Sequence, residues 1–288
     1  MSGHLCSDFT YSDNFEVTGD VMKAFEENGY IIIRSLLSEK EITILRSALE
    51  NDEGIKQHAY ELSATDDGRK TRMCLWNHPG NDITGMIARS EKVAGTMEKL
   101  LGGEVYHFTT KLMMKDARTG GKHIWHQDYG YWYHNGCIFP DMGSFFLAVD
   151  KCSRENGCLQ VLRSSHKLGR IEHLSVGGQI GADLERVNHI MKILELEHVE
   201  MEPGDGLFFH CNVLHRSDRN DSDKRRWVLI TSFNRASNDP YDPEPFPKYT
   251  RLDKVPNSSI ENCTDVTDMA GKDFLDPATD KNVKVDTK

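Results

Sequence analysis

A histidine and a carboxylate stand two residues apart in Ile124-Trp125-His126-Gln127-Asp128, and a second histidine, His215, follows much later in the chain. On a β-strand, residues i and i+2 point to the same face, so His126 and Asp128 can bind one ion. His215 can complete a set of two histidines and one carboxylate. That set leaves three open positions on one side of an octahedral ion, which is typical of non-haem Fe(II) oxygenases. Because the chain has 13 histidines, the His-x-Asp pair alone is weak evidence.

A basic residue and a hydroxyl follow this last histidine at a useful spacing. Arg226 precedes the apolar run Trp227–Phe233, and Ser217 lies just after His215. An arginine that faces the same interior can hold the far carboxylate of a dicarboxylic acid in a bidentate pair. The spacing therefore indicates a dicarboxylate pocket beside the metal.

The elements that position these residues divide into two parts. Helices are predicted over residues 18–29, from Ser38 onward with Glu41 as the partner in a capping box, and over Glu91–Leu101. From residue 104, short apolar runs alternate with turn residues, which predicts an antiparallel sandwich or barrel. These runs are Val105–Met114, Ser144–Val149, Cys158–Leu162, Gly206–His210 and Trp227–Phe233.

One domain is expected over residues 19–237, after an N-terminal extension (1–18) and before a polar C-terminal tail (238–288). An insertion at about 168–196 interrupts the strands, with a predicted helix at Asp183–Glu195. Its glycine-rich part, residues 168–182, is interpreted as a lid that is mobile without substrate.

The overall composition narrows the partners and the compartment. The 288 residues carry a net charge of −10, which argues against nucleic acid or an anionic membrane as the main partner. No apolar run approaches the roughly 20 residues of a membrane span. Seven cysteines without C-x-x-C spacing are typical of free thiols in a reducing compartment, so a cytoplasmic protein is expected. Nothing in the sequence sets the oligomeric state.

Several short motifs occur together in a specific order. They are Trp125-His126-Gln127-Asp128-Tyr129 with Trp132, Glu155-Asn156-Gly157-Cys158-Leu159, Ser164-Ser165-His166-Lys167, Pro203-Gly204-Asp205, and His215-Arg216-Ser217 with Arg226. With them, residues 19–237 resemble the phytanoyl-CoA dioxygenase family of Fe(II)/2-oxoglutarate oxygenases, and within it the members similar to ectoine hydroxylase.

The resemblance implies a mainly β fold with flanking helices, namely a double-stranded β-helix of the cupin-like jelly-roll type. It implies an enzyme that uses Fe(II), 2-oxoglutarate and dioxygen to hydroxylate a small metabolite, with release of succinate and carbon dioxide. The implied iron ligands and catalytic residues are His126, Asp128 and His215. The implied cosubstrate contacts are Lys111, Phe146, Ser217 and Arg226, and the implied substrate contacts are Trp132, His107 and Val228.

Two alternatives remain open. An acyl-CoA could be the substrate, because two basic groups are available for its phosphates; they are Arg163, Lys167 and Arg170, or Arg216, Arg219, Lys224 and Arg225. A jelly-roll protein that binds a metal or ligand without turnover is the alternative from another class. His107 and Val228 stand where ectoine hydroxylase has polar groups that contact its substrate, so ectoine itself is not predicted.

Overall fold

The computed structural model describes residues 5–62, 68–176, 178–242, 246–267 and 270–276. Parts of three predicted segments lie outside the described residues. They are residues 1–4 of the N-terminal extension, residue 177 of the lid, and residues 243–245, 268–269 and 277–288 of the tail.

The N-terminal helices form where their capping residues predict them. Helix α1 (Gly19–Asn28) begins after Thr18, whose side chain accepts a hydrogen bond from the Val21 amide, and it ends at Gly29 in the left-handed conformation (φ 84°). Helix α2 (Glu39–Asn51) has the predicted capping box. The third predicted helix has two parts, a π-helical turn (Glu91–Gly95) followed by α5 (Thr96–Leu101). The remaining helices on this side are α3 (Glu53–His58), α4 (Ile83–Arg89) and α8 (Ser258–Glu261).

The larger sheet has the strand order β1-β2-β12-β7-β14-β5-β4-β3. Strands β1 and β2 are parallel, and all other neighbours in this sheet are antiparallel. In the order of the sheet, the strands are β1 (Asp8–Thr10), β2 (Tyr30–Arg34), β12 (Gly206–His210), β7 (Met142–Ala148), β14 (Arg226–Arg235), β5 (Val105–Lys115), β4 (Arg72–Trp76) and β3 (Tyr60–Glu61).

A smaller antiparallel sheet lies opposite, with the order β11-β8-β13-β6. Its strands are β11 (Leu196–Val199), β8 (Leu159–Leu162), β13 (His215–Ser217) and β6 (His123–His126). Buried side chains from both sheets form one apolar cluster, in which Leu159 and Val161 pack with Phe146, Leu207 and Val228. Two facing sheets around such a core make a jelly roll, the predicted double-stranded β-helix.

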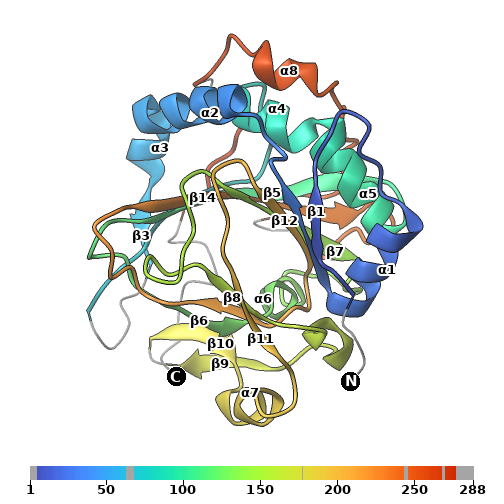
Figure 1. Ribbon diagram of the computed structural model, residues 1–288, viewed down its shortest axis with the longest axis vertical. Helices are drawn as coiled ribbons and strands as arrows, with labels where there is room; N and C mark the ends of the chain where they lie inside the picture. The colour runs from blue at the N-terminus through green and yellow to red at the C-terminus, as the bar shows by residue number, and fades with distance from the viewer. Residues whose placement is uncertain (1–4, 63–67, 177, 243–245, 268–269, 277–288) are drawn as a thin grey trace.

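Helices cover the outer face of the larger sheet. Apolar side chains of α1, α2, α4 and α5 pack with those of β2, β5, β7, β12 and β14 in a second cluster. Figure 1 shows α2, α4 and α5 together on this side of the molecule. The fold is therefore mainly β with flanking helices. Among the described residues, no helix combines the length and the apolar character needed to cross a bilayer.

The predicted insertion lies against the smaller sheet, on the side away from these helices (Figure 1). A 3₁₀ turn (Ser165–Leu168) leads into it, and it continues as the antiparallel hairpin of β9 (His173–Val176) and β10 (Gln179–Ala182). Helix α7 (Leu184–Ile190) follows and is shorter than the predicted Asp183–Glu195. Ala182, Val187 and Ile190 bury themselves against Trp125, which explains how this segment is held beside β6.

The described part of the predicted tail packs against the domain. Phe246 stacks on Phe108, with ring centroids 5.3 Å apart. Lys272 and Asp82 form an ion pair at 2.7 Å, and both side chains are fully buried. Leu275 donates a backbone hydrogen bond to Leu75 on β4. The packed body therefore extends beyond residue 237, where the sequence indicated a boundary.

Candidate metal centre and cosubstrate pocket

The three predicted ligands lie at the ends of short elements that meet inside the jelly roll. His126 is the last residue of β6, Asp128 is the first residue of α6 (Asp128–Trp132), and His215 is the first residue of β13. His126 and His215 are paired in register between the two strands. Asp128 is not on a strand, contrary to the prediction. Gln127 nevertheless keeps an extended backbone (φ −114°, ψ 135°), so the two ligands still face the same side.

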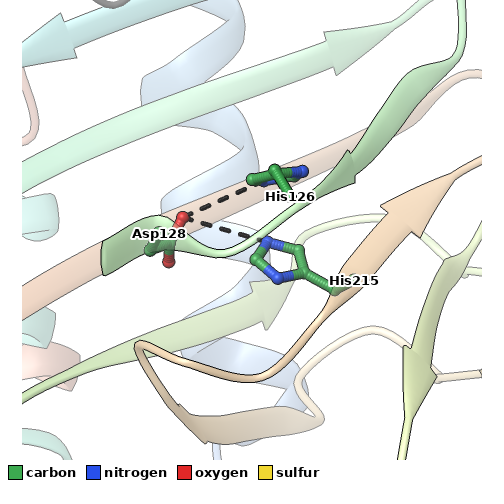
Figure 2. Close-up of side chains that lie close together, drawn as sticks. All are labelled: His126, Asp128 and His215. Atoms are coloured by element: carbon green, nitrogen blue, oxygen red, sulfur yellow. Dashed lines mark ion pairs between the residues drawn. The ribbon is translucent and has the colours of Figure 1, made fainter. Parts of the chain in front are cut away.

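The ligand atoms of these side chains converge, as Figure 2 shows. The Nε2 atom of His126 lies 4.0 Å from Oδ1 of Asp128, and the Nε2 atom of His215 lies 3.9 Å from the same oxygen. One potential ligand atom from each residue lies within 4.8 Å of the others, and all three residues are buried. Within the described ranges, this is the one group of three such residues that can hold a metal ion.

Hydrogen bonds fix the orientation of both imidazole rings. Nδ1 of His126 donates to the Ile124 carbonyl at 2.8 Å, and Nδ1 of His215 donates to the Val213 carbonyl at 2.9 Å. A carbonyl oxygen can only accept, so Nδ1 carries the hydrogen and the Nε2 lone pair remains available. Such outer partners are the usual way in which metal-binding histidines are oriented.

The carboxylate of Asp128 is held in a similar way. Its Oδ2 accepts a hydrogen bond from Ser144 at 2.8 Å, which leaves Oδ1 directed toward the two histidines. Burial opposes its ionisation, but the Lys111 ammonium at 3.8 Å and His215 together hold the pKa of Asp128 below its usual value. The ligand is therefore a carboxylate at neutral pH.

Burial also lowers the pKa of both histidines, His126 most strongly, with His215 as the second cause for that residue. Both rings are consequently neutral near pH 7. Two neutral imidazoles and one carboxylate on one face fit a divalent cation that keeps three positions open. This donor set suits Fe(II).

A cavity of about 140 Å³ adjoins the three ligands. Nine of the ten predicted site residues line it. They are His126, Asp128, His215, Lys111, Phe146, Ser217, Arg226, Trp132 and Val228.

The tenth, His107, does not line the cavity. Its ring is buried between the Asn77 carbonyl (3.0 Å from Nδ1) and the Thr110 hydroxyl (2.7 Å from Nε2), so both nitrogens are engaged within the protein. This position does not support the substrate contact predicted for His107.

The cavity lining also contains a buried arginine. Arg226, the first residue of β14, is almost fully buried. Its Nε and Nη1 atoms have no hydrogen-bond partner among the described residues. Buried donors of this kind are costly unless a ligand satisfies them. A carboxylate is the group that matches the fork of a guanidinium.

Three residues near this site were missed from the sequence. His123 lines the cavity, and its buried Nδ1 atom has no hydrogen-bond partner in the described part of the chain. Phe246 lines it from the C-terminal segment, and Lys115 lies behind Ser217. His123 stands three residues before His126, a spacing that on a regular strand places two side chains on opposite faces, and Lys115 ends an apolar run, so neither carried a local signal. Phe246 follows a proline-rich stretch and carried none.

Comparisons with known proteins identify the family of this chain. The family model described as phytanoyl-CoA dioxygenase (PhyH) matches residues 25–228. L-Proline trans-4-hydroxylase from Streptomyces griseoviridis is 27% identical over 82% of this chain and 94% of its own length. Ectoine dioxygenase from Stutzerimonas stutzeri (strain A1501) is 24% identical over 78% of this chain and 80% of its own.

Solved structures support the same fold. The crystal structure of EctD from S. alaskensis with 2-oxoglutarate and 5-hydroxyectoine superimposes with a TM-score of 0.71, at 22% identity, over 85% of this chain and 90% of that one. The 2-oxoglutarate-dependent carbocyclase SnoK gives a TM-score of 0.64 at 20% identity, over 91% of this chain and 96% of the other.

The facing sheets and the triad with its open side define a non-haem iron oxygenase. The chain belongs to the phytanoyl-CoA dioxygenase family, and it is an Fe(II)/2-oxoglutarate-dependent dioxygenase that uses dioxygen.

Proposed function

We propose that this dioxygenase hydroxylates a free small metabolite, with the far carboxylate of 2-oxoglutarate held by Arg226 and Ser217. The observation that carries the proposal is a cavity lined by both the triad and Arg226, whose Nε and Nη1 atoms have no hydrogen-bond partner among the described residues. When bound, Fe(II) with 2-oxoglutarate and dioxygen supplies the oxidising chemistry that adds a hydroxyl group and releases succinate and carbon dioxide.

The chain's own residues bind and orient the reactants. His126, Asp128 and His215 hold the metal on one face, and Ser144 keeps Asp128 in place. Arg226 and Ser217 fix the carboxylate end of the cosubstrate, and Phe146 supplies an apolar wall beside it. Lys111, which lies 3.8 Å from Asp128 and lines the same cavity, adds a positive charge for the cosubstrate. Holding the reactants in one geometry is the main way in which such a site accelerates the reaction.

The substrate end of the cavity is mostly apolar. Trp132 and Phe246 both line it, and the Phe108 ring packs against each of them. Leu62, Met73 and Leu75 continue this wall, and Ile180 of the β9–β10 hairpin faces it. Dry apolar walls exclude water from the reacting centre. We assign Trp132 to the substrate wall. Val228 stands two residues after Arg226 on β14 and lines the same cavity.

Size and charge favour a free metabolite over an acyl-CoA. The cavity of about 140 Å³ is smaller than the roughly 300–1,000 Å³ of pockets that take drug-sized ligands. Of the seven cations available for CoA phosphates, four are ion-paired within the protein; these are Arg163, Arg170, Arg219 and Arg225. The relative that hydroxylates L-proline, a free amino acid, supports the same substrate class.

The Arg226 site argues against a protein that only binds a ligand or metal. A structural metal site does not require a buried arginine beside it that can bind a carboxylate. Burying an arginine without a partner destabilises the fold. The clamp is useful where a dicarboxylate enters and leaves during turnover.

The test is succinate formation by the purified protein with Fe(II), 2-oxoglutarate and a panel of candidate substrates. The panel contains free amino acids including L-proline, small cyclic metabolites including ectoine, and acyl-CoAs of increasing chain length. We expect stimulation by a member of the first two groups and none by acyl-CoAs. Stimulation by acyl-CoAs alone would contradict the free-metabolite proposal.

A further inference from the structure

A second buried cation stands directly behind the proposed carboxylate clamp. Lys115 is the last residue of β5, and only 1% of its surface is exposed. It is paired in register with Arg226 across the β14–β5 ladder. Among the described residues, neither side chain forms an ion pair with a carboxylate. Two adjacent buried cations that no carboxylate contacts directly are costly for a fold unless a bound anion compensates them.

Lys115 contacts Ser217 and the residue that follows it. Its Nζ atom donates to Oγ of Ser217 at 2.8 Å and also to the carbonyl oxygen of Asp218. Ser217 and Arg226 line the cavity, whereas Lys115 lies behind them. Burial and the neighbouring guanidinium lower the pKa of Lys115 well below its usual value, although the Asp218 carboxylate opposes this shift. An anion bound beside Arg226 would favour the charged form of Lys115.

The hydrogen bond from Lys115 decides what Ser217 can do. A serine hydroxyl has one hydrogen to donate, and its oxygen accepts through lone pairs. Because Lys115 is a donor without an acceptor, it occupies a lone pair of Oγ and leaves the hydroxyl hydrogen to point elsewhere. The cavity is the open direction, so the hydrogen is available to an acceptor beside Arg226.

We infer that Lys115 is a positioning residue for the cosubstrate: it holds the Ser217 hydroxyl as a donor to the far carboxylate of 2-oxoglutarate, so that the pocket selects a dicarboxylic 2-keto acid over a monocarboxylic one. The inference rests on the proposed placement of that carboxylate at Arg226 and Ser217. Lys115 also adds a second positive charge to this end of the pocket. A 2-keto acid without the far carboxylate leaves these buried donors unsatisfied and is rejected for that reason.

The test measures binding without turnover, by titration calorimetry on the full-length protein loaded with Mn(II). The ligands are 2-oxoglutarate and 2-oxobutyrate, which lacks the far carboxylate. The variants are Lys115→Met, Ser217→Ala, their combination, and Arg226→Met, with Lys23→Met as an exposed control of the same chemistry. The affinity for Mn(II) is measured for each variant.

We expect Lys115→Met and Ser217→Ala each to weaken 2-oxoglutarate by about tenfold or more, the loss of one hydrogen bond to a charged group. Mn(II) should bind as it does to the parent protein. The affinity for 2-oxobutyrate should stay the same or rise, because each variant removes a donor that this acid leaves unsatisfied. The double variant should be no weaker than the lysine variant by more than about threefold, since Lys115 acts through Ser217. Fully additive losses, or unchanged 2-oxoglutarate binding in Lys115→Met, would overturn the inference.

Two further outcomes separate the possible failures. Equal weakening of 2-oxoglutarate, 2-oxobutyrate and Mn(II) in Lys115→Met would mean a general structural role and would also overturn the inference. Unchanged 2-oxoglutarate binding in Arg226→Met would show instead that the placement of the carboxylate in the proposed function is wrong. If Lys115→Met does not fold, Lys115→Gln carries the same comparison.

Discussion

Replacing Lys272 by methionine is expected to destabilise the whole domain, although this residue lies in the segment that the sequence indicated as a polar tail. Its Nζ atom lies 2.7 Å from Oδ2 of Asp82, and neither side chain is exposed. It also donates to the Thr84 hydroxyl at 2.8 Å and lies 4.5 Å from the Trp76 ring centroid. The substitution would leave the Asp82 carboxylate buried with one oxygen unpaired.

The size of the effect follows from this burial. Breaking a buried ion pair by removing one partner costs about 3–5 kcal/mol. A domain is stable by only about 5–15 kcal/mol, so Lys272→Met should remove a large part of the free energy of unfolding. A partly exposed pair at similar distance is the matched control: Lys254 and Glu98 lie 2.6 Å apart with side chains 30% and 24% exposed. Lys254→Met should cost no more than about 1 kcal/mol.

Urea-induced unfolding, followed by circular dichroism, measures both variants against the parent protein. The double variant Asp82→Asn with Lys272→Met should cost less than the sum of the two single changes, because it leaves no uncompensated buried charge. A loss in Lys272→Met as small as that in Lys254→Met would refute the reasoning. It would mean that the C-terminal segment unfolds separately from the jelly roll.

Four other results are expected. Asp128→Ala should lower Fe(II) affinity and succinate formation by at least about a hundredfold, since changes to outer partners alone cost 10–100-fold; calorimetry and a turnover assay check this. Arg226→Ala should weaken 2-oxoglutarate by about thirtyfold or more while Fe(II) affinity stays nearly constant, and equal affinities would assign the carboxylate to another cation. Burial lowers the pKa of His173 to about 4, so the unfolded chain binds more protons between pH 4 and 6.5, and stability falls as the pH decreases through this range. The slope is about 1.4 kcal/mol per pH unit for this group, and it should be absent in urea unfolding of His173→Asn. Residues 168–182 should gain protection from hydrogen exchange when the true substrate binds to the loaded enzyme, and unchanged protection would remove the lid hypothesis.

The sequence was sufficient for the elements whose signals are local. Helix α1 begins after Thr18 and ends at Gly29, as their capping chemistry predicts. Helix α2 begins at the capping box formed by Ser38 and Glu41. The five apolar runs became β5, β7, β8, β12 and β14, because burial on both faces gives strands a continuous apolar pattern. The triad could be recognised because three ligand types at a specific spacing define one chemistry.

Features that depend on distant contacts could not be predicted. Lys115 ends an apolar run, and a lysine there is usually solvent-exposed; only the pairing of β5 with β14 brings it to Arg226. Phe246 reaches the cavity because its ring stacks on Phe108, a residue far away in the sequence. The polar composition after residue 238 indicated a loose tail, but one buried pair, Lys272 with Asp82, is enough to hold the described part of it.

The residue between the two metal ligands of the His-x-Asp pair connects the metal site with the predicted lid. Gln127 is fully buried, and its side chain donates to the Gly169 carbonyl at 2.8 Å and accepts from the Ile171 amide at 2.7 Å. Its backbone amide donates to Nε2 of His173, the first residue of β9, at 3.0 Å. The extended backbone at Gln127 therefore points His126 and Asp128 into the cavity and Gln127 toward the insertion. The start of the insertion is fixed to the ligand loop, so a closing movement would have to occur beyond His173, in the hairpin that carries Ile180 into the cavity wall.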